Sequence, residues 1–266
     1  MEYGICNLSI IPCRKEPADQ SEMVSQLLFG DHFKVLEKRK KWSRIRNAFD
    51  KYESWIDNKQ YQLVSSEFYR SLDTETPIYS NDLISIASGL ENVSVNVLLG
   101  SRLPKYDNGT LKIENDSFQI STEITSNENR TKKQLVTNAL RFLNVPYLWG
   151  GVSPLGIDCS GFTQLIYKLN GMQLPRDAYQ QAELGESLSF VEEAEPGDLA
   201  FFDNEEGNII HVGIVLENNH IIHASGKVRI DRIDHQGIHN QETRSYSHKL
   251  RIIKRITKNG TSIKKR

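Results

Sequence analysis

Residues 145–163 read Val-Pro-Tyr-Leu-Trp-Gly-Gly-Val-Ser-Pro-Leu-Gly-Ile-Asp-Cys-Ser-Gly-Phe-Thr, a loop rich in glycine and proline that leads into an apolar segment. Apolar residues then recur at positions i, i+3, i+4 and i+7, which predicts one buried face of a helix. They are Phe162, Leu165, Ile166 and Leu169. Asp158 suits the N-cap of this helix, and Asn170-Gly171 suits its end. The stretch therefore predicts a helix that carries Cys159 in its first turn.

Cys159 is the first candidate functional residue. A thiol at a helix N-terminus lies beside unpaired backbone N–H groups and the positive end of the helix dipole, which lowers its pKa and favours a nucleophilic thiolate. The alternative is a buried structural thiol, because free cysteine is among the most buried residue types. The other two cysteines, Cys6 and Cys13, show no paired spacing, so a disulfide framework is not expected.

Two histidines lie in His211-Val-Gly-Ile-Val-Leu-Glu-Asn-Asn-His-Ile-Ile-His223, which reads as two strands around an asparagine-containing turn. A three-residue loop at 217–219, with a left-handed Asn219, places His223 opposite Gly213 and both imidazoles on one face. A two-residue loop places them on opposite faces. Covalent catalysis needs a nucleophile, a base and a group that orients the base, so this chemistry favours the three-residue loop.

Four motifs follow one another along the chain: Asp158-Cys-Ser-Gly-Phe, Pro196-Gly-Asp-Leu-Ala-Phe-Phe, His211-Val-Gly-Ile and Ile222-His-Ala-Ser. In this order and spacing they resemble the NlpC-type cysteine peptidases of bacterial cell-wall metabolism. The resemblance implies an α+β fold with a papain-like catalytic domain. It implies Cys159 as nucleophile, His211 as general base, and His223 as the third catalytic residue, which accepts a hydrogen bond from His211. A half-exposed strand histidine is the alternative for His211, and a surface histidine on an edge strand is the alternative for His223.

The same resemblance extends to three residues near the nucleophile. It implies that the hydroxyl of Tyr147 reaches the active site and helps to stabilise the oxyanion. It implies that Asp158 and Ser160 help to hold the amino terminus of the substrate. The alternatives are a packed aromatic pair for Tyr147 with Trp149 and a plain helix cap for Asp158. A negative Asp158 opposes thiolate formation, so the helix dipole and His211 have to outweigh it.

A zinc site built from the cysteine and histidines is a competing interpretation. Zinc usually needs three or four ligands at recognisable spacings, and only Cys159, His211 and His223 are expected to converge. No metal and no cofactor are implied. The remaining candidates for ligands match no motif and are expected to be solvated. They are His220, His235, His239 and His248.

The sequence pattern before the catalytic domain is typical of small β-barrels. Short apolar runs at residues 5–11, 32–36, 42–45 and 54–56 are separated by polar turns. These stretches resemble a bacterial SH3-like domain, and residues 66–125 are interpreted as a second, diverged one. The expected organisation is therefore SH3-like domains at 1–65 and 66–125, a peptidase domain at 126–256 that begins with a polar linker, and a basic tail at 257–266. Within the peptidase domain, the capping-box spacing of Thr131 and Gln134 before an apolar stripe predicts a first helix. Residues 174–181 are expected to be a polar loop, and residues 228–233 a strand.

Two residues of the first SH3-like domain are further candidates by resemblance. Relatives of the γ-D-glutamyl-L-diamino-acid endopeptidase type close the substrate groove with an acid after a Leu-aromatic-Gly turn and with a tyrosine near a tryptophan strand. The matching residues are Asp31 and Tyr52. Asp31 is one methylene shorter than the usual Glu, and Ala178 stands where many relatives have Ser. The alternative is that Asp31 and Tyr52 are surface residues of a barrel.

Composition narrows the function class. The 266 residues are 38 % hydrophobic and 25 % charged with a formal net charge of −1, which is typical of a soluble globular protein and offers no general attraction to nucleic acid or membranes. The N-terminus lacks the basic region of a secretory signal, and no apolar stretch approaches a membrane span. We therefore expect a cytoplasmic monomer without nucleic-acid or membrane partners.

The resemblance implies a cysteine endopeptidase that hydrolyses the bond between γ-D-glutamate and a diamino acid, meso-diaminopimelate or Lys. The expected substrates are murein tri- or tetrapeptides with a free N-terminal L-Ala, met during cell-wall peptide recycling. A non-catalytic peptidoglycan-binding module, a secreted hydrolase of polymeric cell wall and an acyltransferase on a related scaffold are the alternatives. Cys159, His211 and His223 together disfavour the first, and the absence of a signal disfavours the second.

Overall fold

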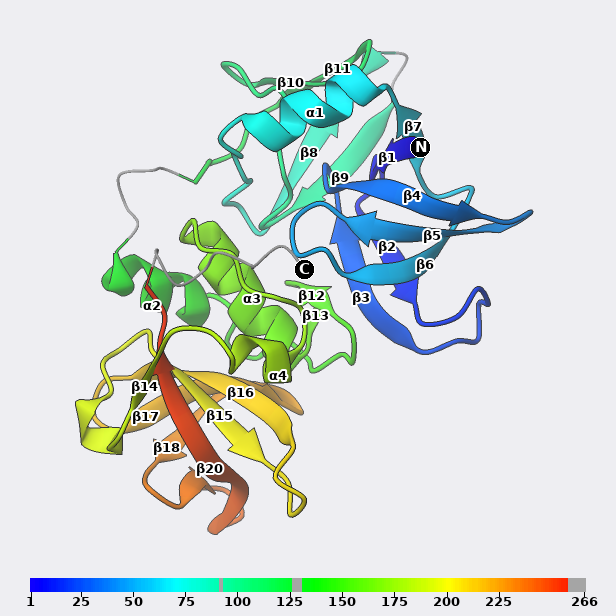
Figure 1. The fold of residues 1–266 in the computed structure, drawn as a ribbon. Helices are drawn as coiled ribbons and strands as arrows, with labels where there is room; N and C mark the ends of the chain where they lie inside the picture. Colours follow the sequence, from blue (N-terminus) through cyan, green and yellow to red (C-terminus); the bar gives the residue numbers. More distant parts are fainter. Residues whose placement is uncertain (91–92, 126–130, 258–266) are drawn as a thin grey trace. The chain divides into compact units, whose positions relative to one another are not determined.

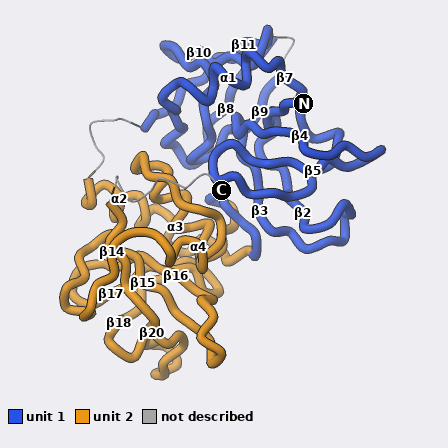
Figure 2. The backbone as a smooth tube through the Cα atoms, viewed as in Figure 1, with its two compact units in different colours: residues 1–126, 149–154 blue, residues 127–148, 155–266 orange. Residues whose placement is uncertain are grey.

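The computed structural model describes residues 1–90, 93–125 and 131–257, so the predicted linker and most of the predicted tail lie outside the described residues. The chain forms two compact units (Figures 1 and 2). Unit 1 contains Met1–Ser126 and Trp149–Pro154, and unit 2 contains Asn127–Leu148 and Leu155–Arg266. No helix among the described residues is long and apolar enough to cross a membrane.

The first part of unit 1 is a seven-stranded antiparallel sheet with the order β3-β2-β6-β5-β4-β1-β7. Its buried apolar residues form one core around Ile11, Phe33 and Ile45. The run 5–11, expected as one strand, is two strands, because the chain bends at Leu8 and Ser9. The strands are β1 (Glu2–Ile5), β2 (Ile10–Arg14), β3 (Met23–Leu28), β4 (His32–Lys38), β5 (Trp42–Asn47), β6 (Glu53–Asp57) and β7 (Gln62–Val64).

The second part of unit 1 is a four-stranded antiparallel sheet with the order β10-β11-β8-β9, preceded by a helix. The helix α1 (Ser66–Thr74) was not predicted; it begins where the Ser65 side chain accepts from the Phe68 N–H. Leu72 of α1 shares a core with residues of both sheets, including Ile5 and Leu111. The strands are β8 (Ile84–Ser88), β9 (Ser94–Leu98), β10 (Thr110–Ile113) and β11 (Asp116–Ile120). Unit 1 also includes β12 (Val152–Ser153).

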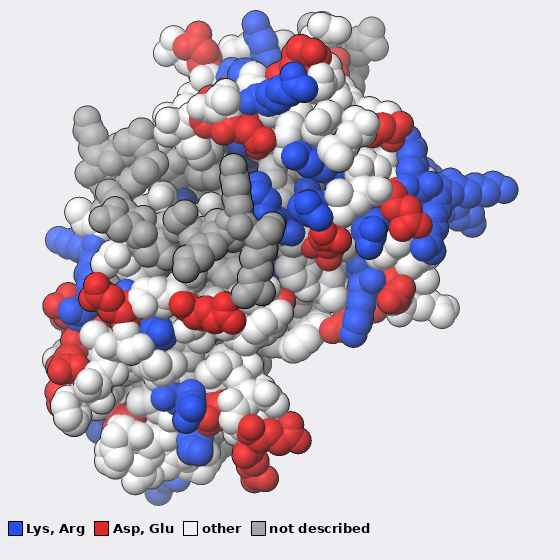
Figure 3. Space-filling view, viewed as in Figure 1, with Lys and Arg blue, Asp and Glu red and all other residues white. Residues whose placement is uncertain are grey.

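Basic and acidic side chains are interspersed over the face drawn in Figure 3. The loop between β4 and β5, with basic residues at 38–41, projects at the right of this view. The mixture agrees with the net charge of −1.

Unit 2 carries the helices that the sequence predicted. Helix α2 (Lys132–Leu140) is capped by Thr131, and α3 (Cys159–Leu169) is capped by Asp158, whose carboxylate accepts from the Gly161 N–H. Both predicted starts are confirmed. The short strand β13 (Gly156–Ile157) precedes α3, and the short helices α4 (Ala178–Gln181) and η2 (Val191–Glu193) follow it.

The sheet of unit 2 has the order β14-β20-β15-β16-β17-β18-β19, and β19 also pairs with β20. This extra pairing closes β15 to β20 into a barrel, which is filled by residues such as Phe202, Val215 and Ile253. Helix α3 packs against β16 and β17 (Figure 1). The strands are β14 (Glu186–Leu188), β15 (Leu199–Asp203), β16 (Ile209–Leu216), β17 (His220–Ser225), β18 (Lys227–Ile233), β19 (Gly237–Asn240) and β20 (Ser245–Arg255).

Candidate active site

The hairpin of β16 and β17 has the three-residue loop that the chemistry predicted. Leu216 pairs with His220, and Gly213 pairs with His223, as expected. Asn219 is left-handed, and so is Asn218, each with φ 56°. Gly213 leaves room for the opposite histidine, because a Cβ at residue 213 would lie 2.9 Å from the Cβ of His223. The register therefore places both imidazoles on one face of the hairpin.

The two imidazoles are in direct contact. His211 Nε2 lies 2.8 Å from His223 Nδ1, and the rings are nearly perpendicular at 85°. Both side chains are buried, which contradicts the half-exposed and surface alternatives. Burial, and then the neighbouring His223 and His248, lower the pKa of His211 well below its ordinary value. His211 is therefore neutral at working pH and has a lone pair with which to act as a base.

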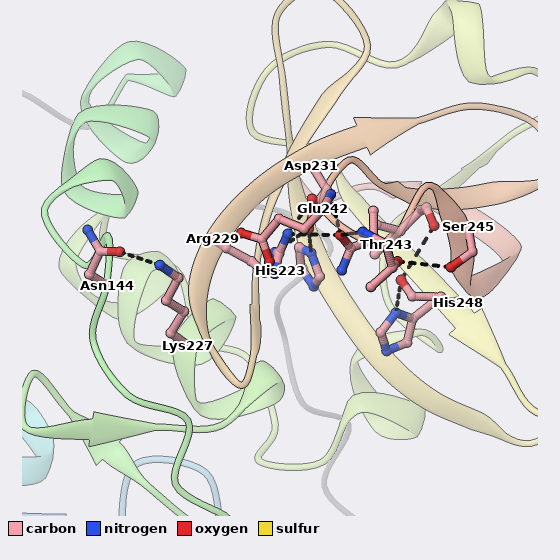
Figure 4. Close-up of polar contacts among 12 residues, drawn as sticks. Asn144, His223, Lys227, Arg229, Asp231, Glu242, Thr243, Ser245 and His248 are labelled. Atoms are coloured by element: carbon pink, nitrogen blue, oxygen red, sulfur yellow. Dashed lines mark hydrogen bonds and ion pairs between the residues drawn. The ribbon is translucent and has the colours of Figure 1, made fainter.

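An ion pair that the sequence did not predict lies behind His223 (Figure 4). His223 Nε2 is 3.0 Å from Asp231 Oδ2, and Arg229 contacts both oxygens of Asp231, at 2.6 and 2.9 Å. Burial alone raises the pKa of Asp231, but the hydrogen bonds from His223 and Arg229 outweigh it and lower the pKa to about 2. The carboxylate is therefore ionised.

A signal for this pair was present in the sequence. Residues 228–233 were expected to be a strand, and side chains alternate along a strand. Arg229 pairs with His223, so Asp231, two residues further on, shares its face. Extending the hairpin register by one strand finds both residues.

The nucleophile candidate lies at the first residue of α3, with 7 % of Cys159 exposed. Its sulfur accepts hydrogen bonds from the backbone of Val212, the residue after His211 on β16, and of Ser160. Burial, and then the Asp158 carboxylate, nevertheless raise the pKa of Cys159 to about 12. The expectation that the helix terminus lowers this pKa is wrong for the resting site. Thiolate formation must therefore come from proton transfer to a base.

Asp158 has a buried partner, Arg176. The guanidinium donates to Asp158 Oδ1 at 3.1 Å and to Ser160 Oγ at 2.9 Å, while Asp158 also accepts from the Gly161 N–H at 2.7 Å. Arg176 is 2 % exposed. The stretch 174–181 was expected to be a polar loop throughout, and this is wrong for residues 178–181, which form α4. Asp158 is thus both a helix cap and half of an ion pair.

Tyr147 lies within electrostatic reach of the nucleophile. Burial, and then Cys159 and Asp158, raise the pKa of its phenol, which therefore stays protonated and can donate. Its backbone N–H donates to the carbonyl of Gly226 at 3.0 Å. Trp149, the expected packing partner, belongs to unit 1, where its Nε1 donates to Glu22 at 2.8 Å.

His248 on β20 was expected to be solvated, and this is wrong. Its ring stacks on His211 with a centroid distance of 4.1 Å and an angle of 24°. Burial and His223 lower the pKa of His248 to about 4, against a smaller opposing effect of Asp231. Of the other three unassigned histidines, His235 is exposed, whereas His220 and His239 are partly buried.

Asp31 and Tyr52 belong to unit 1. Asp31 is buried, and its Oδ2 accepts from the Leu28 N–H at 2.8 Å. It is therefore no surface residue. Tyr52 is partly buried, and its N–H donates to Asp50 Oδ1 at 3.0 Å. What these two side chains bind stays a prediction. Among the described residues, no three or more His, Cys, Asp or Glu side chains are arranged to hold a metal ion.

Two family models match the chain: the NlpC/P60 family at residues 144–247 and the bacterial dipeptidyl-peptidase SH3 domain at residues 13–60. A γ-D-glutamyl-L-lysine dipeptidyl-peptidase of Bacillus subtilis is 29 % identical over 75 % of this chain and 71 % of its own length. Dipeptidyl-peptidase 6 of Lysinibacillus sphaericus is 28 % identical over 83 % and 88 %.

The fold is shared with a crystal structure of an NlpC/P60 family protein from Bacillus cereus, with a TM-score of 0.80 and 21 % identity over 95 % of this chain and 99 % of the other. The NlpC/P60 family is a family of cysteine peptidases. The chain therefore carries an NlpC/P60 domain preceded by a bacterial dipeptidyl-peptidase SH3 domain.

Proposed function

We propose that the protein is a cysteine endopeptidase that cleaves the bond between γ-D-glutamate and a diamino acid, Lys or meso-diaminopimelate, in short murein peptides with a free N-terminal L-Ala. The observation that carries the reaction type is the buried contact of His211 with His223 at 2.8 Å, on the strand whose Val212 N–H bonds the Cys159 sulfur. The names of the relatives support the bond that is cut.

The proposed reaction begins with proton transfer from the Cys159 thiol to His211. The sulfur attacks the γ-carbonyl carbon of D-glutamate and forms a C–S bond, which gives a tetrahedral oxyanion. The C–N bond then breaks, and His211 gives its proton to the departing amine of the diamino acid. Water, deprotonated by His211, hydrolyses the thioester and releases the γ-D-glutamyl product with the free thiol.

Tyr147 and the backbone N–H of Cys159 are the proposed donors to the oxyanion. The raised pKa of Tyr147 supports this role, because a phenol has to keep its proton in order to donate it. Preorganised donors of this kind are worth about 3 kcal/mol each in the transition state.

We propose that Asp158 and Ser160 help to hold the free amine of the substrate, with Asp31 and Tyr52 as further contributors. Arg176 already contacts Asp158 and Ser160, so its guanidinium partly neutralises the negative charge of Asp158 before a substrate binds. Acetylation of the amine removes its positive charge and should nearly stop cleavage. Asp31→Asn should narrow the difference between free and acetylated peptides, and an unchanged difference would exclude Asp31 from amine recognition.

The setting that we propose is cytoplasmic recycling of cell-wall peptides by a monomer, since peptides with a free amine arise once the glycan has been removed. Residues 66–125 are proposed to be a diverged SH3-like domain, which the antiparallel sheet of β8 to β11 supports.

One digest tests the proposed function. L-Ala-γ-D-Glu-meso-diaminopimelate, its L-Lys counterpart and the N-acetylated form of each are incubated with wild type and with Cys159→Ala, and products are identified by mass spectrometry. Release of L-Ala-γ-D-Glu from the free peptides by wild type alone is expected. Equal cleavage of acetylated peptides would favour a hydrolase of polymeric cell wall. No cleavage of any peptide would favour a binding module.

A further inference from the structure

A chain of polar contacts leads from His211 across three neighbouring strands. His211 on β16 contacts His223 on β17 at 2.8 Å, and His223 contacts Asp231 on β18 at 3.0 Å. The side chains of His223 and Asp231 are 1 % and 2 % exposed. Arg229 completes the chain and continues to Glu242 at 3.1 Å and Asn240 at 3.2 Å, as Figure 4 shows for Arg229 and Glu242.

The donors and acceptors in this chain fix the position of every proton. Arg229 can only donate, and an ionised Asp231 can only accept. His223 must therefore carry its proton on Nε2 and donate it to Asp231, which leaves a lone pair on Nδ1. His211 must in turn carry its proton on Nε2 and donate it to His223. The lone pair of neutral His211 is then on Nδ1, the nitrogen that remains for the thiol proton.

The carboxylate also affects the charged state of the base. When His211 takes the proton of Cys159, the resulting imidazolium still donates from Nε2 to a neutral His223. The negative end of the His223 dipole, backed by the Asp231 charge, faces this imidazolium. The arrangement opposes the burial that disfavours a charged His211. Arg229 keeps Asp231 ionised, so that Asp231 does not take the proton of His223.

We propose that Asp231 is a positioning residue that, through His223, holds His211 in the tautomer able to accept the proton of Cys159. This inference rests on the roles of Cys159 and His211 in the proposed function, but it is independent of which peptide is cut. A purely structural Asp231, which only ties β17 to β18, is the alternative.

Asp231→Asn separates the two possibilities, because an amide of the same size keeps a hydrogen bond but can reverse its direction. Asn can donate to His223 Nε2, which moves the His223 proton to Nδ1 and the His211 proton to Nδ1 as well. The lone pair of His211 then lies on Nε2, toward His223, and Nδ1 can no longer accept the thiol proton. We expect kcat to fall on the order of ten- to a thousandfold with KM nearly unchanged, as for a base held in the wrong tautomer.

A second readout needs no substrate. The rate of Cys159 alkylation by iodoacetamide, followed by peptide mass spectrometry against pH, reports the thiolate fraction. The charged and titratable groups around the two imidazoles are Asp231 and Arg229 on β18, His248 on β20, and Glu242 in the turn between β19 and β20. Asp231→Asn should lower the alkylation rate at pH 7 on the order of tenfold, because the imidazolium that accompanies the thiolate loses its support.

The matched control is Asp234→Asn, at a carboxylate just beyond β18 that accepts from Tyr246 and from the Gln236 N–H. This change should leave kcat and the alkylation profile unaltered. In wild type, ¹⁵N spectra of labelled histidines should show His223 and His211 protonated at Nε2, a measurement that needs no variant to fold. His223 protonated at Nδ1 in wild type would overturn the inference, as would an Asp231→Asn protein with a normal alkylation profile.

The outcomes distinguish the proposed peptidase function from the positioning role of Asp231. If wild type cleaves none of the peptides but the alkylation profile and tautomers respond to Asp231→Asn as expected, the substrate assignment fails and the positioning role stands. If the peptides are cleaved and the Asn variant behaves as wild type, the positioning role fails alone.

Discussion

Two aspartate–arginine pairs of unit 2, Asp158 with Arg176 and Asp231 with Arg229, are expected to have opposite effects on the proposed reaction. In the pair beside the proposed nucleophile, Asp158 and Arg176 have side chains 9 % and 2 % exposed, and the carboxylate also caps α3. In the pair behind the proposed base, Asp231 is 2 % exposed, but Arg229 is 15 % exposed and is shared with Glu242. Both side chains of the first pair are buried, whereas the contacts of the second pair run from the exposed Glu242 to the buried His223.

The difference shows that the effect of a buried carboxylate depends on the groups that lie between it and the reacting atom. Asp158 adjoins the thiol directly and raises the pKa of Cys159. Asp231 acts through a histidine, so its charge reaches the base as an oriented hydrogen bond. Two pairs of the same composition are therefore expected to act in opposite directions. Asp158 disfavours the thiolate of Cys159, whereas Asp231 favours proton transfer to His211.

The largest expected effect is on stability, from Arg176→Gln. The change leaves a buried carboxylate at Asp158 without its cation, which typically costs about 3–5 kcal/mol. The matched change Arg229→Gln should cost only about 1–2 kcal/mol, because Arg229 is partly exposed and Asp231 keeps its contact with His223. Urea unfolding of both variants measures the two costs. Equal losses would mean that the two pairs do not differ in the way their burial indicates.

The next effect concerns pH, because three histidines, His211, His223 and His248, lie in contact with one another beside the second pair. The pKa of His248 is lowered to about 4, so the unfolded chain binds a proton more readily than the folded protein below pH 6.5. Stability is therefore complete above pH 6.5 and falls as the pH drops toward 4. The two pKa values imply a loss of roughly 3 kcal/mol, which solvent screening of this partly exposed ring reduces to about 2 kcal/mol. His211 adds a loss of the same sign, and Asp231, with a pKa of about 2, adds a further loss below pH 4.

Unfolding measured at pH 7, 5.5 and 4 checks this dependence. His248→Gln should flatten the slope between pH 6.5 and 4, whereas His235→Gln, at an exposed position, should leave it unchanged. A slope that does not respond to His248→Gln would show that the stacked ring ionises as freely as in the unfolded chain.

The sequence predicted one residue of the first pair, Asp158, and neither residue of the second. Local signals located α2, α3 and their caps, because capping residues depend on neighbours in the chain. The register of the histidine hairpin was chosen instead by the requirement of covalent catalysis for both imidazoles on one face. Asp158 was found because it adjoins the cysteine. Arg176, 18 residues from Asp158, was missed, since its burial depends on packing that no local pattern records.

Other residues were missed for different reasons. Asp231 and Arg229 required the hairpin register to be carried one strand further. His248 lies on β20, which is joined to β16 through the earlier strand β15, so no local spacing connects it with His211. The pKa of Cys159 was misjudged because the helix terminus was considered without the burial around it.

A smaller effect, on the alkylation rate of Cys159, tests whether the two carboxylates act in opposite directions. Simple Coulomb repulsion predicts that loss of either carboxylate makes the Cys159 thiolate easier to form. The positioning role predicts that only Asp158→Asn does so, with alkylation at pH 7 rising on the order of three- to tenfold, while Asp231→Asn lowers it. Asn still serves as an N-cap, so α3 should be retained. Changes of the same sign in both variants would show that the thiol responds to net charge alone.

The smallest effect is expected at the outer end of the second pair. Glu242 is 70 % exposed and contacts Arg229 at 3.1 Å, and an exposed ion pair of this kind contributes little. Arg229 retains both contacts with Asp231 when Glu242 is replaced, so Asp231 stays ionised and His223 keeps its tautomer. Glu242→Gln should therefore leave kcat within about twofold of wild type in the peptide digest. If Glu242→Gln lowered kcat as strongly as Asp231→Asn, control of the base would begin at the surface carboxylate, and Asp231 would only transmit it.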